Sequence, residues 1–122
     1  MADSHAHEST SPLAAISNAL VALHKEQFGR GPTRARTEYA GPDALVCIME
    51  DALLPAEKAM VEMGAAHRVQ ESRLFFQSAT AQHFVAAVER TVGRKVRSFS
   101  SSLDPHEGVV AEIYVLFPRD GG

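Results

Sequence analysis

The amino-acid sequence predicts a single α+β domain in which helices pack on one face of an antiparallel sheet. Three observations lead to this fold class. The chain has 122 residues, of which 45% are hydrophobic, and this supports one core and excludes two domains. Some segments carry apolar residues at helical spacing, whereas others alternate or are apolar throughout. These segments follow the order helix, strand, strand, helix, helix, strand, strand, which suits two hairpins and a helical layer.

The start of the chain predicts a tail followed by a helix. Residues 1–10 are polar, and we expect a disordered N-terminal tail because they bury too little apolar surface to offset the entropy of ordering. The domain is expected over residues 11–118, with a short C-terminal tail over 119–122. Ser11 followed by Pro12 is typical of a helix start, and apolar residues three and four apart then predict an amphipathic helix that ends at Gly29.

The next part of the chain predicts a hairpin. Two glycines and a proline in residues 29–33 favour a tight turn. Residues 34–39 alternate between the two faces, as a half-exposed strand does. After a turn at residues 41–43, residues 44–49 (ALVCIM) are apolar on both faces. We therefore expect a central strand that is covered on both sides, either by the helices or by a second subunit.

Two further helices are predicted in the middle of the chain. Pro55 and Glu57 suit a helix N-terminus and its dipole, and Gly64 is expected to end or weaken this helix. Another helical stretch runs from about residue 65 to a cap at Gly93. If residues 67–92 form one helix, it is about 39 Å long, so it either crosses the whole domain or breaks near residues 78–80.

The C-terminal segments predict a second hairpin. Residues 96–103 and 109–117 read as strands joined by a turn-rich loop over 104–108, and the serine run at 98–102 indicates an edge strand. One face of the last strand is wholly apolar: Val109, Ala111, Ile113, Val115 and Phe117. The opposite face is mixed: Val110, Glu112, Tyr114 and Leu116. We expect the mixed face to be an outer face that is partly covered or part of an interface, and we predict a homodimer.

Composition excludes several classes of protein. The net charge of -3 argues against a nucleic-acid binder. The longest nearly apolar stretch, residues 13–23, is too short to span a membrane, and the N-terminus lacks the basic and apolar regions of a secretory signal. The lone Cys47 forms no intrachain disulfide. These features predict a cytoplasmic protein.

The glycine-rich turn provides the candidate site. Exposed backbone N–H groups and nearby guanidinium groups can hold an anion or an acidic partner. The candidate residues are Gly29, Arg30, Gly31, Arg34 and Arg36. A plain helix-to-strand turn is the alternative, because the spacing does not fit a phosphate-binding loop and the turn follows a helix. A second basic cluster (Arg90, Arg94, Lys95 and Arg97) is explained by the dipole at a helix C-terminus.

No complete catalytic or metal-binding set is evident. His67 and Glu71 share a helical face but lack a third ligand, so we expect no metal and no cofactor. The loop residues Ser102, Asp104 and His106 are better explained by turn formation than by a catalytic triad.

Other chemically distinctive side chains have structural explanations. Cys47 is expected to be an inert core residue. His24 is expected at the surface or at its boundary. Phe75, Phe76 and Phe84 are expected in the core, or alternatively on a face that docks a partner helix.

Four sequence blocks in this order resemble the MpsC-like domain family of bacteria: GRGPTRAR, LLPAEKAMVEMG, HRVQESRLFF and AVERTVGRKVRSF. The resemblance covers residues 13–117. One departure is Leu54, where the family favours a threonine that would cap the second helix. The family name refers to a sodium-translocating, membrane-potential-generating system, and the resemblance offers no catalytic residues to transfer.

The resemblance therefore implies a non-enzymatic accessory or interaction subunit of an ion- or solute-transport system. Such a subunit meets a membrane transport protein from the cytoplasm, peripherally at the inner membrane face. The residues alone leave two alternatives open: a small anion- or ligand-binding regulatory module, and a small enzyme whose site no motif reveals.

Overall fold

The four strands form one antiparallel sheet. The computed structural model describes residues 11–119 and places the strands in the order β1-β2-β4-β3. Their bounds are β1 (Arg34–Tyr39), β2 (Ala44–Glu50), β3 (Val96–Asp104) and β4 (Val109–Leu116). The central position of β2 and the edge position of β3 confirm the predictions from their composition. The predicted N-terminal tail and residues 120–122 lie outside the described residues.

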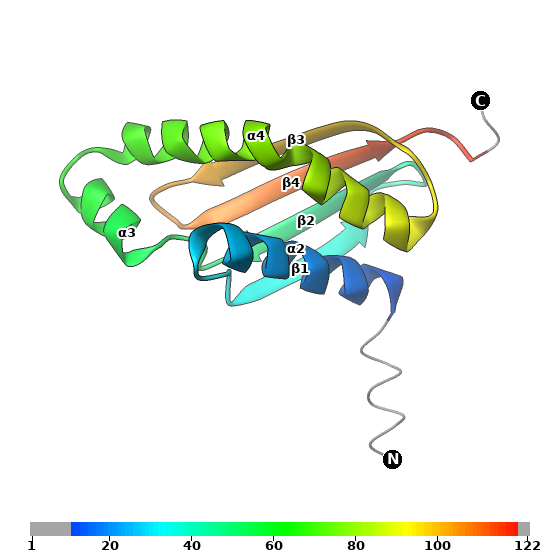
Figure 1. Cartoon of the computed structure of the whole chain (residues 1–122), viewed down its shortest axis with the longest axis horizontal. Coiled ribbons are helices and arrows are strands. Elements are labelled where there is room, and N and C mark those ends of the chain that lie inside the picture. Colours follow the sequence, from blue (N-terminus) through cyan, green and yellow to red (C-terminus); the bar gives the residue numbers. More distant parts are fainter. Residues whose placement is uncertain (1–10, 120–122) are drawn as a thin grey trace, which may run out of the picture.

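The helices cover one face of this sheet (Figure 1). They are α2 (Pro12–Phe28), α3 (Pro55–Glu62) and α4 (Ala66–Val92). The α2 helix packs over β1 and α4 packs over β3, while the short α3 contacts α4. The predicted α+β fold, its element order and the one-sided helical layer are confirmed. None of the helices in residues 11–119 is both long and apolar enough to cross a membrane.

The predicted ends of α2 are confirmed. The Ser11 side chain accepts a hydrogen bond from the backbone N–H of Ala14 at 3.3 Å, and Gly29 ends the helix with a left-handed φ of 83°. At Gly31 the chain crosses close over α2, because an added Cβ would lie 3.0 Å from the carbonyl oxygen of Val21. The glycines therefore serve the tight turn that leads into β1.

The long helix α4 is unbroken. Its 27 residues span about 40 Å, so the helix crosses the full width of the domain. The side that packs on the sheet is set by Val69, Phe84 and Val88, which are buried. The prediction that Phe75 and Phe76 belong to the core is wrong, because Phe75 is 70% exposed and Phe76 is 40% exposed.

The core lies between the sheet and the two long helices. It contains Leu45, Cys47 and Met49 from β2, together with Val110 and Tyr114 from β4. The expectation that the mixed face of β4 is an outer face is therefore wrong. This face points toward the helices, and the wholly apolar face points away from them. The reason is that Glu112, which made the face look polar, has hydrogen-bond partners inside the core.

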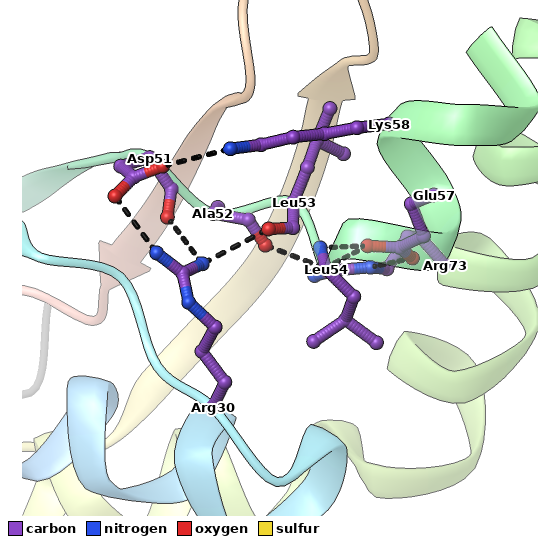
Figure 2. A network of polar contacts seen from close by, with 8 residues as sticks. All are labelled: Arg30, Asp51, Ala52, Leu53, Leu54, Glu57, Lys58 and Arg73. Atoms are coloured by element: carbon purple, nitrogen blue, oxygen red, sulfur yellow. Dashed lines mark hydrogen bonds and ion pairs between the residues drawn. The ribbon is translucent and has the colours of Figure 1, made fainter.

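Two arginines fix the connection between β2 and the helices (Figure 2). The buried Arg73 of α4 donates two hydrogen bonds of 2.7 Å to the carboxylate of Glu57 and one of 2.6 Å to the carbonyl of Ala52. Arg30 donates to the carbonyl oxygens of Asp51 and Leu53, and to the Asp51 carboxylate at 2.8 Å. The arginines thus satisfy carbonyl groups where the chain leaves the sheet.

Glu57 also takes over the capping of α3. The side chain of Leu54 cannot cap the helix, but its backbone N–H donates to the Glu57 carboxylate at 2.8 Å. Burial alone would raise the pKa of Glu57. The hydrogen bonds from Arg73 and from the Leu54 N–H outweigh this effect, so the pKa of Glu57 is lowered. One carboxylate therefore joins α3, α4 and the segment after β2.

Replacing Glu57 by glutamine leaves the buried Arg73 charge without a partner. We expect the Glu57→Gln variant to lose about 3 kcal/mol of unfolding free energy at pH 7. Because the pKa is lowered on folding, the carboxylate stabilises the fold above its unfolded-state pKa and ceases to do so as the pH falls through its folded-state pKa. The difference from wild type should therefore shrink below about pH 4.

Urea unfolding followed by circular dichroism between pH 7 and pH 3 measures this difference. The control is Glu62→Gln, because Glu62 is exposed on the same helix and should change stability by less than about 0.5 kcal/mol. Equal stabilities of Glu57→Gln and wild type at pH 7 would show that the ion pair does not hold α3 and α4 together.

Candidate functional site

A row of polar side chains crosses the helix-facing side of the sheet. Thr37, Cys47, Glu112 and Ser101 are direct register neighbours on β1, β2, β4 and β3. Ser17 of α2 extends this polar row, since its hydroxyl lies 2.7 Å from that of Thr37. The row interrupts an otherwise apolar core, and it leads from the β1 side of the domain to a cleft beside α4.

Glu112 is the most unusual member of the polar row, because its carboxylate lies in the core with only 1% of the residue exposed. The hydroxyl of Tyr114 donates to Oε1 at 2.7 Å, and that of Ser101 donates to Oε2 at 3.3 Å. His24 Nε2 lies 3.5 Å from Oε2. A buried carboxylate is costly unless donors surround it, and here β3 and β4 each provide one.

His24 is buried, so the expectation of a surface or boundary position is wrong. Its ring stacks on Phe28 and meets Phe84 edge to face, with centroids 6.0 and 5.2 Å apart. The residue is 7% exposed, and Nε2 has no hydrogen-bond partner among the described residues. The apolar residues one turn away on α2 draw this side of the helix onto the sheet, and His24 goes with them.

A cleft of about 390 Å³ opens next to this histidine and carboxylate. It lies between the end of α2 and the first half of α4, next to residues of β3 and β4. The two helices diverge in this region (Figure 1). We call it the helix cleft. Its walls are mainly apolar, with Phe28, Leu74, Phe84, Leu103 and Val110. Glu112 and His24 are the buried polar residues at its inner end.

The two reactive side chains of the core are held in their neutral forms. Burial raises the pKa of the Cys47 thiol to about 11, against the effect of its contact with Thr37. Burial and the neighbouring Glu112 carboxylate raise the pKa of Tyr114. Tyr114 therefore stays a hydrogen-bond donor to Glu112, and Cys47 is a poor nucleophile.

The predicted basic site is divided by the structure. Gly29, Gly31 and Arg30 lie at the turn after α2, where the Arg30 guanidinium is engaged with Asp51 and Leu53. Arg34 and Arg36 lie on β1 and point to the side of the sheet away from the helices. The structure thus does not bring the three guanidinium groups together. Anion or partner binding at this turn stays a prediction.

The second basic cluster includes another structural arginine. Arg94 is buried and donates to the carbonyl oxygens of Pro42 and Phe117 and to the Asp43 carboxylate, at 2.9, 2.7 and 2.6 Å. It ties the loop after α4 to the β1-β2 turn and to the end of β4. This role differs from the predicted helix-dipole explanation, which needs no such contacts.

The remaining candidates do not form a site. Residues 11–119 contain no group of three or more histidine, cysteine or acidic residues that could hold a metal ion. The Asp104 carboxylate accepts hydrogen bonds from the backbone N–H groups of His106 and Glu107, so it caps the turn. This agrees with turn formation as the explanation for these loop residues.

The face of the sheet opposite the helices is covered by no described part of the chain. We call it the open face. Its centre is apolar, with Val46 and Ile48 from β2 and Ala111, Ile113 and Val115 from β4. Ser98, Ser100 and Ser102 of β3 flank it on one side, and Arg34, Arg36 and Glu38 of β1 flank it on the other. Ile113, at the centre, is 43% exposed.

Sequence reasoning missed both His24 and Glu112. A pattern that points to Glu112 does exist. Thr37, Cys47 and Ser101 are small polar residues at the same level of neighbouring strands. Once the strand register is known, such a row predicts a buried polar site. No local pattern singles out His24, because its burial depends on how α2 lies over the sheet.

Together, the one-sided helical layer, the helix cleft and the open face characterise a small α+β domain. Comparison with protein families identifies it further. The chain belongs to the MpsC family, described as "Na+-translocating membrane potential-generating system (MpsC)", whose model matches residues 10–117. Searches of curated proteins and of solved structures gave no significant match.

Burial of Cys47 leads to a prediction about its reactivity. We expect the thiol of the folded protein to react with a disulfide reagent such as DTNB at least 100-fold more slowly at pH 8 than in guanidinium-unfolded chain, because it is buried and its pKa is about 11. Absorbance at the wavelength of the released thiolate measures both rates. Comparable rates in the folded and unfolded protein would show that the polar row is open to solvent.

Proposed function

We propose that this chain is a non-enzymatic interaction subunit linked to a Na⁺-translocating membrane-potential-generating system, and that it works as a homodimer joined through the open faces of its sheets. The observation that carries the proposal is the apolar centre of the open face. An antiparallel sheet tolerates one solvated face when that face is polar, but here β2 and β4 contribute aliphatic side chains on both faces.

The charges on β1 suit a second copy of the same chain. Arg36 lies level with Ile48, and Glu38 lies level with Val46, one step further along the strands. In the proposed dimer, two copies stack with their open faces together. A two-fold axis that lies between the sheets, perpendicular to the strands and midway between these two levels, places each strand over the same strand of the partner subunit. Arg36 then faces Glu38 of the partner subunit, and the serines of β3 face serines. This pairing is self-complementary, as a two-fold interface requires.

An axis parallel to the strands fits less well. It would place the charged β1 of one copy over the serine-rich β3 of the other, so the arginines and the glutamate would lose water without gaining partners of opposite charge. The charge pattern therefore favours one of the two ways in which such sheets stack.

The size of the open face predicts a weak dimer. Four strands about 4.8 Å apart and four side-chain levels about 7 Å apart give roughly 500 Å² per copy. Stable interfaces bury about 800 Å² per partner, so we expect dissociation in the micromolar range. A dimer of this kind can also exchange its second copy for another apolar partner surface.

The link to the membrane system rests on the family. The family description supports a role beside a Na⁺-translocating membrane-potential-generating system. We propose that the subunit is located in the cytoplasm, at the inner face of the membrane. None of its described helices spans the bilayer, and an accessory role at this face does not require one that does. In the proposed dimer, Arg34 and Arg36 contact the partner subunit, whereas Arg30 keeps its structural contacts.

The charge pairing gives the dimer a specific test. The Arg36→Glu variant should weaken self-association at least tenfold, about 1.4 kcal/mol, because it sets like charges against each other on both sides of the axis. Adding Glu38→Arg in the same chain restores opposite charges and should restore association. Sedimentation equilibrium over about 1 to 300 μM, with the 13.2 kDa monomer as reference, measures the constants.

Two controls make the result decisive. Glu26→Arg alters charge on an exposed position of α2, away from the open face, and should leave association unchanged. Ile113→Lys places a charge in the apolar centre and should abolish the dimer without unfolding the domain. A parent chain that stays monomeric throughout, or a double variant that associates no better than Arg36→Glu, would contradict the proposed interface.

The link to membrane potential is tested in cells that carry the Na⁺-translocating system. Removing the chain is expected to lower the Na⁺-dependent part of the membrane potential, measured with a potential-sensitive dye in media with and without Na⁺. Wild type and the double charge-swap variant should restore it, and Ile113→Lys should not. An unchanged Na⁺-dependent potential after removal of the chain would refute the accessory role, even if the dimer forms.

A further inference from the structure

The helix cleft has the size and shape of a small-molecule site. Its volume of about 390 Å³ lies in the range of ligand pockets, which is about 300 to 1,000 Å³. The cleft lies on the helix-covered side of the sheet, away from the open face. Occupation of the cleft and formation of the proposed dimer are therefore separate events, and each can fail without the other.

The apolar walls of the helix cleft favour a ligand with an apolar body. Phe28, Phe84 and Leu74 contribute from the helices, and Leu103 and Val110 contribute from the sheet. The one buried cation at this cleft, Arg73, is held by Glu57 and lies 4.1 Å from the centre of the Phe28 ring. Its charge is therefore already neutralised, and the exposed Glu71 adds an acidic group to the lining, so the cleft offers no free arginine or lysine to an anionic ligand.

The inner end of the cleft contains a polar atom without a partner. His24 Nε2 is buried and makes no hydrogen bond within residues 11–119. It lies 3.5 Å from Glu112 Oε2, which is longer than the roughly 2.7 to 3.2 Å of an N–H···O hydrogen bond. Leaving a buried polar atom unsatisfied is costly, so this position favours a ligand group that can reach it.

A hydroxyl group fits this position better than other polar groups. Its oxygen can accept a hydrogen bond from His24 while its proton is donated to Glu112, whose carboxylate keeps unused lone pairs after binding Tyr114 and Ser101. A carbonyl can only accept and would leave the carboxylate without a new donor. A carboxylate ligand would be repelled by Glu112, and an ammonium ion cannot accept from His24.

We propose that the helix cleft binds a small neutral molecule with an aromatic or aliphatic body and one hydroxyl group, and that this hydroxyl bridges His24 and Glu112. The body lies against Phe28, Phe84 and Leu103, and the open side of the cleft beside Leu74 is its entrance.

Four probes that share a 4-propylphenyl body test the class of ligand on the full chain. They are 4-propylphenol, its methyl ether 4-propylanisole, the anion 4-propylbenzoate and the cation 4-propylbenzylamine. Titrations followed by NMR shifts of the backbone amides and of the His24 ring should give a dissociation constant for the phenol at least tenfold lower than for the ether. The benzoate and the amine should bind more weakly than the phenol.

Variants locate the site. Leu74→Trp fills the entrance and should weaken phenol binding at least tenfold, whereas Met63→Trp, an equally large change at an exposed residue outside the cleft, should not. His24→Phe keeps an aromatic ring and should remove the preference for the phenol over the ether. If this variant does not fold, the probe ranking in the parent and the Leu74→Trp comparison still decide the matter.

Three results would overturn the proposal. The first is that none of the probes binds to the parent chain. The second is that the ether, the benzoate or the amine binds as tightly as the phenol, which would refute recognition of the hydroxyl. The third is that Leu74→Trp binds the phenol as well as the parent does, which would place the probe outside the cleft.

Discussion

The rest of this fold is arranged around the burial of one carboxylate. Glu112 sits in the second central strand with 1% exposure, and such a group is tolerated only where donors surround it. Tyr114 on the same strand and Ser101 on the neighbouring strand donate to its two oxygens, and His24 on α2 lies 3.5 Å from one of them without a hydrogen bond. A shift of β3 by one residue would turn Ser101 to the other face of the sheet, and a shift of α2 along its axis would remove His24. The carboxylate therefore favours one register and one helix position over their alternatives.

Each face of the sheet contains some residues that are unusual for its position. The covered face contains the polar row, and the open face contains the aliphatic residues of β2 and β4. The covered face still buries the apolar core, including Leu45, Met49 and Leu116, so the polar row is a small part of it. In the functions proposed above, the covered face keeps polar atoms at the inner end of the helix cleft, and the open face gains its burial from a second copy.

The sequence was sufficient to predict elements but not to predict which face of β4 is inside. Ser11, Pro12, Gly29 and Gly93 mark helix ends through local backbone geometry, and these predictions are confirmed. Strand alternation gives two faces without saying which one meets the helices, and Glu112 made the inner face look like the outer one. The same limit applies to His24 and Phe75, whose burial depends on how the helices lie over the sheet. The site was missed because its residues come from four elements that only the tertiary fold brings together.

The arginines show that a cluster of charges along the sequence does not by itself identify a binding surface. Arg30, Arg73 and Arg94 come from three segments, yet each donates to backbone carbonyls and to one carboxylate at a point where the chain leaves a strand or helix. A guanidinium group suits this task because its donors spread in a plane and its charge persists at all physiological pH values. The guanidinium groups of these arginines are engaged in contacts within the fold. Because Arg30 is one of them, the basic turn has fewer free cations than its composition suggests. Arg34 and Arg36 differ from them, because alternation along β1 sends both to the open face beside Glu38. Of the three arginines in the predicted basic site, Arg34 and Arg36 therefore lie at one edge of the same face that exposes the aliphatic residues of β2 and β4.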